Sequence, residues 1–221
     1  MIDISSQIIT IKLTLPVIFD LGAVFVFGIT GALAALYRGY DFIGLFALAF
    51  VTGVGGGLIR DSVFIQHGPP AVATDGRYFF AILLSVIVGL LFHKKKKHMA
   101  KIIAVFDSVG LGAYAVVGVQ KALAASLSIP ASIMVGIINA AGGGLLRDIL
   151  VSEEPLLFKP GQLYVLAALA GCVLYIFLAV YSGIRAEAAA LVTIAFTFIL
   201  RMLAIKFNWS TKPLYRPEEE E

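Results

Sequence analysis

Two short stretches of this sequence combine flexible backbone with opposite charges: GVGGGLIRDS at residues 53–62 and AAGGGLLRDI at residues 140–149. Each contains three consecutive glycines, and the six are Gly55, Gly56, Gly57, Gly142, Gly143 and Gly144. An arginine and an aspartate follow each triplet at the same spacing. A glycine costs a helix interior about 1 kcal/mol relative to alanine, so a triplet favours local bending or opening. The stretches therefore predict a polar backbone site with fixed charges beside it.

Four charged side chains extend this site along the chain. Asp20 and Asp107 lie within or near the ends of apolar runs, where an unpaired charge costs about 2.5 to 3.5 kcal/mol. Arg60 and Arg147 are the natural partners, and together the four could line the two mouths of one path. The alternative is that they form static ion pairs that hold helix ends. The remaining aspartates of the motif, Asp61 and Asp148, are expected at the interface or as helix caps.

Composition identifies the surroundings of these charges as a membrane. Hydrophobic residues make up 60% of the chain and charged residues 14%, and the mean hydropathy is +0.96. The 17 basic residues do not form a basic face for nucleic acid. The histidines lack metal-ligand spacing, and no nucleophile motif or phosphate-binding loop occurs. We therefore expect an integral membrane protein that is not an enzyme, with no metal or cofactor and with membrane lipids around it.

Apolar runs of spanning length predict seven transmembrane helices within one domain, residues 1–221. The predicted spans are Leu15–Tyr37, Phe42–Ile59, Arg77–Phe92, Ile102–Leu123, Pro130–Leu146, Gly161–Tyr181 and Ala186–Ile205. The first run could instead be a signal peptide, because GALAAL resembles a cleavage site. Asp20 within the run argues against that alternative.

The chain also contains an internal repeat. A shift of 87 residues (142 minus 55) aligns the two glycine motifs without a gap, and it pairs Asp20 with Asp107. Repeat one covers about residues 15–93 and repeat two about 102–182, each with three spans, and the seventh helix covers about 186–206. An odd number of spans forces the second copy to enter the membrane from the opposite side. The fold class is therefore an all-α inverted repeat of two three-helix units plus a seventh helix that packs outside the path.

The repeat also aligns two polar residues of the middle spans, Thr52 and Asn139. Each precedes the central glycine of its triplet by four residues and lies on roughly that face of the helix. Their oxygens could serve a passing ion. The alternative reading of the glycines is close helix packing, because small residues let backbones approach.

Basic residues set the orientation. The loop HKKKKHMAK, residues 93–101, carries five lysines and is predicted to be cytoplasmic. The seven spans then place twelve of the 17 basic residues inside and five outside. The amino terminus lies outside and the carboxyl terminus, with its acidic tail at residues 218–221, is cytoplasmic. A site for anionic lipid is the alternative reading of the lysines.

The doubled GGG-x-x-R-D motif, the paired three-span units and the seventh span resemble the prokaryotic members of the trimeric intracellular cation (TRIC) channel family, which is related to bacterial glycine transporter proteins. The resemblance covers about residues 19–205. It implies a homotrimer in the cell membrane with a potassium-permeable pore in each protomer. The six glycines would act as pore or hinge residues, with Arg60 and Arg147 beside them.

Three functions therefore compete. The first is a channel for monovalent cations, with potassium as the permeant ion and sodium as a second candidate. The second is a secondary transporter of a small amino acid such as glycine, whose carboxylate could bind a helix amino end and an arginine. The third is a structural membrane protein.

Overall fold

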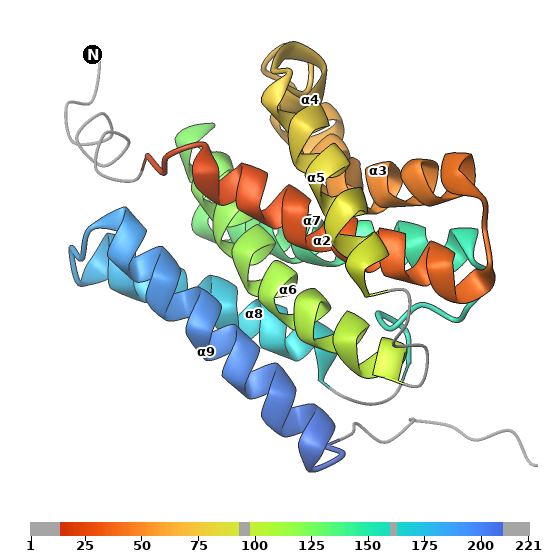
Figure 1. Cartoon of the computed structure of the whole chain (residues 1–221). Coiled ribbons are helices and arrows are strands. Elements are labelled where there is room, and N and C mark those ends of the chain that lie inside the picture. Colours follow the sequence, from red (N-terminus) through yellow and green to blue (C-terminus); the bar gives the residue numbers. More distant parts are fainter. Residues whose placement is uncertain (1–13, 93–97, 160–162, 210–221) are drawn as a thin grey trace, which may run out of the picture.

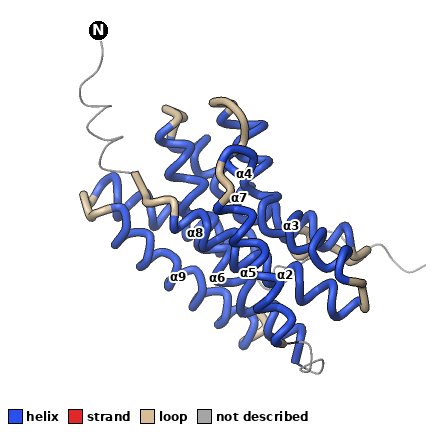
Figure 2. Tube along the Cα trace, turned by 45° about the horizontal axis from the view of Figure 1, so that its top comes forward, coloured by secondary structure: helices blue, strands red, loops and turns tan. Residues whose placement is uncertain are grey.

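The computed structural model describes residues 14–92, 98–159 and 163–209, and every regular element in these ranges is a helix (Figure 2). The lysine run of residues 93–97 and the acidic tail of residues 218–221 lie outside the described residues. The elements are α2 (Ile18–Arg38), α3 (Phe42–Ile59), the π-helix η1 (Arg60–Ile65), α4 (Ala71–Thr74), α5 (Arg77–Leu91), α6 (Met99–Ala124), α7 (Ile129–Leu150), α8 (Tyr164–Ile176), the π-helix η3 (Phe177–Tyr181) and α9 (Ala186–Lys206).

Six of these helices are long and apolar enough to cross a membrane. They are α2, α3 with η1, α6, α7, α8 with η3, and α9. The remaining predicted span is the apolar helix α5, which has 15 residues. At 1.5 Å per residue it is about 22 Å long, shorter than the roughly 30 Å hydrocarbon core of a bilayer. The protein is therefore a multi-pass α-helical membrane protein in which α5 is the short member.

Local sequence explains where the first two helices meet. Gly39 ends α2 in the left-handed conformation, with φ of 76°, and its N–H bonds to carbonyls of the last turn. Glycine adopts this conformation without steric cost. Two residues later the Asp41 carboxylate accepts a 2.8 Å hydrogen bond from the N–H of Gly44 and caps α3. A short, fixed corner therefore joins α2 to α3.

Two pairs of long helices form the centre of the bundle. In the first pair α2 packs on α6, and in the second α3 packs on α7. The chain direction of α2 is opposite to that of α6, and α3 likewise opposes α7 (Figure 1). Lys121, near the end of α6, contacts Asp20, near the start of α2. Because α2 packs on α3, α5 and α6, it is an integral part of the bundle, which argues against the signal-peptide reading.

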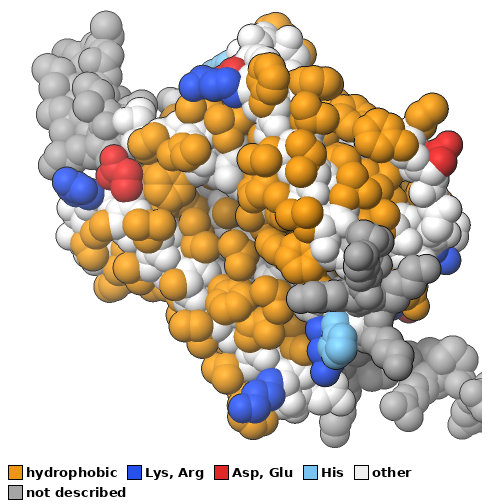
Figure 3. Space-filling view, in the orientation of Figure 1, with side chains coloured by type: hydrophobic (Ala, Val, Ile, Leu, Met, Phe, Trp, Pro, Cys, Tyr) orange, Lys and Arg blue, Asp and Glu red, His pale blue; other side chains and the backbone are white. Residues whose placement is uncertain are grey.

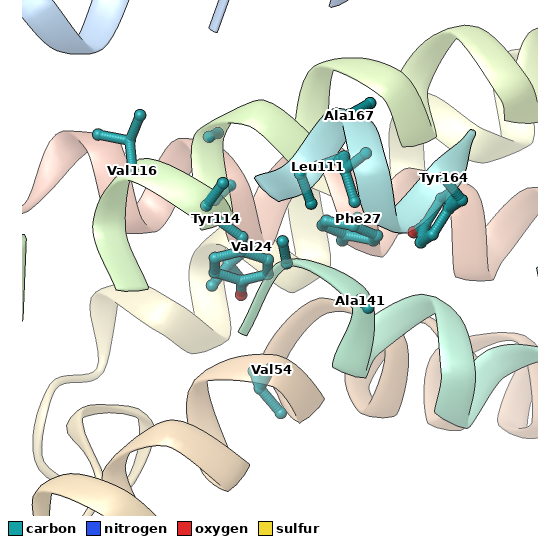
Figure 4. Packing of buried hydrophobic residues seen from close by; sticks show 14 of the residues in the cluster. Val24, Phe27, Val54, Leu111, Tyr114, Val116, Ala141, Tyr164 and Ala167 are labelled. Carbon is teal, nitrogen blue, oxygen red and sulfur yellow. The ribbon is translucent and has the colours of Figure 1, made fainter. Parts of the chain in front are cut away.

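The interior is tightly packed around two aromatic rings. Phe27 of α2 stacks on Tyr114 of α6 with 5.2 Å between ring centroids (Figure 4). The Tyr114 hydroxyl donates to the carbonyl of Gly53. In contrast, apolar side chains cover most of the face seen in Figure 3, and charged groups lie mainly toward its edges. An apolar exterior around a packed interior fits a lipid environment.

Both glycine triplets lie inside continuous helix. Residues 55–57 are helical within α3, and residues 142–144 are helical within α7, which continues past the predicted end at Leu146 to Leu150. Of the two helices that contain the triplets, only α3 changes to π-helical geometry, and it does so after its triplet, where η1 begins at Arg60. The triplets therefore do not open the helices in this conformation.

Candidate functional site

The first charged cluster, defined as Asp20, Arg60, Asp61 and Lys121, lies where α2, η1 and α6 meet. The Asp20 Oδ2 atom accepts hydrogen bonds from Lys121 Nζ at 2.7 Å and from Arg60 Nη2 at 3.3 Å. The Tyr78 hydroxyl donates to the same oxygen at 2.8 Å. Arg60 is 1% exposed and also bonds Asp61. The predicted pairing of Asp20 with Arg60 is present in the structure.

The second charged cluster, defined as Asp107, Arg147 and Asp148, lies where α6 and α7 meet. The Arg147 guanidinium donates to Asp107 Oδ1 at 3.0 Å and to Asp148 Oδ1 at 2.9 Å. It also donates to the Thr30 hydroxyl of α2 at 3.0 Å. Each arginine of the repeated motif therefore binds the aspartate next to it and a second one that precedes it by 40 residues (60 minus 20, and 147 minus 107).

The aspartates of the motif connect the arginines to the following loops. Asp61 Oδ2 accepts from the N–H of Ala71, the first residue of α4, at 3.3 Å. Asp148 Oδ2 accepts from the N–H of Leu156 at 3.2 Å. The expected capping role is therefore met in part at Asp61. The expectation that Asp148 is not buried is wrong, because the residue is 5% exposed and its charge is neutralised by Arg147.

Each charged cluster borders a cavity. A cavity of about 390 Å³ is lined by Asp61 and Lys121 of the first cluster. A larger cavity of about 680 Å³ is lined by all three residues of the second cluster. The seventh helix, predicted to pack outside the path, contributes Met202 and Ile205 of α9 to the lining of the larger cavity.

Between the clusters, α3 and α7 cross with their backbones in contact at the triplets. A Cβ atom on Gly56 would meet the carbonyl oxygen of Asn139, and one on Gly143 would meet the carbonyl oxygen of Thr52. A Cβ on Gly142 would lie 3.1 Å from the Cα of Gly56. These contacts correspond to the packing alternative for the triplets. The crossing closes the space between the two clusters in this conformation.

The two polar residues aligned by the repeat both lie in this crossing and are fully buried. Asn139 donates to the backbone carbonyl of Tyr114 at 2.6 Å and accepts from Arg60 Nη1 at 3.3 Å. The Thr52 hydroxyl has no hydrogen-bond partner among the described residues. A buried hydroxyl without a partner is costly and therefore unusual in a folded protein.

Sequence reasoning missed two members of the site. Lys121 was counted only among the basic residues on the outer side, but its ammonium group bonds Asp20. Arg201 was counted only among the cytoplasmic basic residues, but it is 1% exposed, with its guanidinium carbon 4.8 Å from the centroid of the Tyr164 ring. The repeat could not reveal these cations, because neither has a charged counterpart 87 residues away. Their positions inside predicted apolar spans were the available clue.

Together these features define a class: a multi-pass helical membrane protein with two buried ion-pair clusters on either side of a glycine crossing. Residues 17–94 and 104–180 each match the sequence model of the family described as "Glycine transporter". The chain belongs to this family. The two matches begin 87 residues apart (104 minus 17) and together cover most of the chain.

Individual relatives agree with this assignment. The UPF0126 membrane protein YvgT of Bacillus subtilis is 32% identical over 185 residues, covering 83% of this chain and 88% of the relative. The crystal structure of the TRIC trimeric intracellular cation channel orthologue from Rhodobacter sphaeroides is 30% identical, with a TM-score of 0.79, and the match covers 86% of this chain and 97% of that one. A prokaryotic TRIC channel crystallised in 0.5 M KCl is 28% identical, with a TM-score of 0.76 and coverage of 86% and 95%. The suspected relationship to the TRIC channels is confirmed.

Proposed function

We propose that the protein conducts monovalent cations, potassium above all, through a pore in each protomer of a homotrimer. The observation that carries the proposal is a series of three buried oxygens without hydrogen-bond partners among the described residues. They are Asp20 Oδ1 in the first cluster, Thr52 Oγ1 at the crossing and Asp107 Oδ2 in the second cluster. Oxygen ligands of this kind replace the water around a permeating cation.

The neighbouring cavities support the same path. Beside Asp20, Arg60 and Tyr114 lies a further void of about 10 Å³, room for about one water. A cation would pass from the 390 Å³ cavity along this void, through the crossing, and into the 680 Å³ cavity. Conduction requires the crossing to separate, so this conformation is the closed state. The six glycines are the proposed hinge. They have no side chains that interlock at the crossing, so α3 and α7 can move apart there.

Topology and assembly belong to the same proposal. The antiparallel directions of α2 and α6, and of α3 and α7, support an inverted repeat (Figure 1). The connection through α4 and α5 would supply the third crossing of repeat one, so that the chain has seven spans. The basic residues favour an amino terminus outside and a cytoplasmic carboxyl terminus. The description of the Rhodobacter sphaeroides relative as trimeric supports a homotrimer here.

Purified protein in planar bilayers tests the proposal directly. Under a KCl gradient we expect discrete unitary currents that reverse near the potassium equilibrium potential. Saturable glycine uptake into vesicles without unitary currents would overturn the channel and establish the transporter.

Neutralising the aspartates tests the path. We expect Asp20→Asn and Asp107→Asn each to reduce potassium conductance several-fold, most strongly at low salt, because each removes a negative ligand from one end. Asp75→Asn is the matched control, since Asp75 lies in a loop where it pairs with the exposed Arg77. Unchanged conductance and reversal potential in both test variants would remove the aspartates from the mechanism.

The larger cavity favours glycine transport as the second candidate function. It presents Asp107 and Asp148 beside Arg147, groups that could bind the ammonium and carboxylate ends of a small amino acid. The description of the matching family as glycine transporter supports the same reading. Glycine that stabilises the purified protein against heating, with loss of the effect in Asp107→Asn, would favour this candidate.

A further inference from the structure

The two charged clusters differ in how their charges balance. In the first cluster the carboxylates of Asp20 and Asp61 face two cations, Arg60 and Lys121. In the second, the ion pairs of Asp107 and Asp148 with described residues are those with Arg147. The second cluster therefore has one carboxylate more than its directly bound cations, in a region where uncompensated charge is unfavourable.

A further cation lies behind this cluster. Arg201 projects from α9 and is 1% exposed, with its guanidinium 4.8 Å from the ring centroid of Tyr164. Exposed cations, such as Lys101 and Lys159, line the same cavity. Their fields are screened by water and salt, whereas a buried charge acts through a lower dielectric.

Tyr164 connects the buried arginine to the cluster. Around the position that a Cβ of Gly144 would occupy, the Tyr164 hydroxyl lies at 3.1 Å, Asp107 Oδ1 at 3.6 Å and Arg147 Nη2 at 3.8 Å. The absence of a side chain at Gly144 lets these three groups converge. The Tyr164 ring thus lies against Arg201, while its hydroxyl lies near Asp107 and Arg147, which line the larger cavity.

We propose that Arg201 is the second cation of the second charged cluster and, acting through Tyr164, controls how readily cations enter from the larger cavity. This role rests on the proposed cation conduction. Arg201 is a positioning residue with an electrostatic effect, the counterpart of Lys121 at the other end. Its positive charge neutralises the floor of the cavity. Removing the charge leaves the floor net negative and raises the local concentration of cations there.

The test uses membrane patches from cells expressing the full chain, where all copies share one orientation. The measured quantity is the ratio of the cation current that enters from the larger cavity to the cation current in the opposite direction. In Arg201→Gln we expect this ratio to rise several-fold in about 0.01 M KCl. In about 1 M KCl the ratio should equal that of the wild type, because the Debye length there is about 3 Å. Arg201→Lys keeps the charge and should restore the wild-type ratio. Lys121→Gln should shift the ratio in the opposite direction.

Lys206→Gln is the matched control, because Lys206 ends the same helix but lies over Phe207 rather than Tyr164. It should leave the current ratio unchanged. A wild-type ratio in Arg201→Gln at low salt, or a change of equal size at both salt concentrations, would overturn the proposal. If Arg201→Gln does not assemble, the double variant Arg201→Gln/Asp107→Asn should assemble, because it removes one charge of each sign. Failure of the double variant would also overturn it.

A second readout separates this proposal from the channel proposal. The melting temperature in detergent should fall in Arg201→Gln and in Asp107→Asn, and the double variant should regain part of the loss. If the double variant regains melting temperature but no variant or wild-type protein carries a cation current, conduction is refuted and the pairing of Arg201 with the second charged cluster stands. If cation currents are present but the double variant regains no melting temperature, the role of Arg201 is refuted and the channel proposal stands.

Discussion

Replacing Gly56 with alanine is expected to destabilise the assembled protein by about 1 to 3 kcal/mol, the usual cost of overpacking. The added methyl would meet the backbone carbonyl of Asn139, which cannot rotate away as a side chain can. Relief requires α3 and α7 to move apart at their crossing. Gly143→Ala should have the same effect, because its methyl would meet the carbonyl of Thr52.

Gly57→Ala is the matched control within the same triplet. There the nearest atom to a new Cβ is Arg60 Nη2 at 3.5 Å, an ordinary contact, and alanine favours helix by about 1 kcal/mol over glycine. Gly57→Ala should therefore match or exceed wild-type stability. The measurement is thermal loss of the assembled species in detergent, followed by size-exclusion chromatography. Equal melting temperatures for Gly56→Ala and Gly57→Ala would contradict the crossing as the reason for Gly56.

The second large effect is expected at Arg147. Arg147→Met keeps the aliphatic stem but leaves Asp107 and Asp148 buried without their cation, and breaking a buried pair in this way costs about 3 to 5 kcal/mol. Much of the protein should fail to assemble at ordinary growth temperature. Arg77→Met removes an arginine from a surface pair with 62% of its side chain exposed and should behave like wild type.

The double variant Arg147→Met/Asp107→Leu separates loss of charge balance from loss of a specific contact. Apolar replacement of a whole buried pair is often close to neutral for stability. Because Asp148 stays charged without Arg147, we expect the double variant to recover part of the melting temperature lost in Arg147→Met, while remaining without current. A double variant less stable than Arg147→Met would show that the cluster stabilises the fold through its geometry rather than its charge balance.

Much of the fold was predictable from local sequence. The second span was placed at Phe42–Ile59, which are the bounds of α3, because these residues form an apolar run of spanning length. The pairing of Asp20 with Arg60 followed from the cost of an isolated charge in lipid, and the repeat then indicated the second pair. These features depend on composition, spacing and duplication, which one sequence contains.

The number of membrane spans and the ends of the helices were harder to predict from the sequence. The run at Arg77–Phe92 looked like the other spans, but α5 contains 15 residues, and the sequence cannot say how a short helix meets a bilayer. The fifth span was predicted to end at Leu146, yet the helix continues because Arg147 and Asp148 are neutralised by each other and by Asp107. A charge ends an apolar run in a sequence but need not end a helix.

The role of the glycines and the full set of cations were decided only by tertiary structure. Bending and packing give the same GGG pattern, and the difference depends on the carbonyl of Asn139 opposite Gly56. Lys121 and Arg201 became part of the site because α6 and α9 present them to buried aspartates and an aromatic ring. A span that is apolar on every side has little helical periodicity to mark its buried face. The sequence by itself therefore determined which segments are helical and which charges need partners, and the packing of the bundle determined which partners they have.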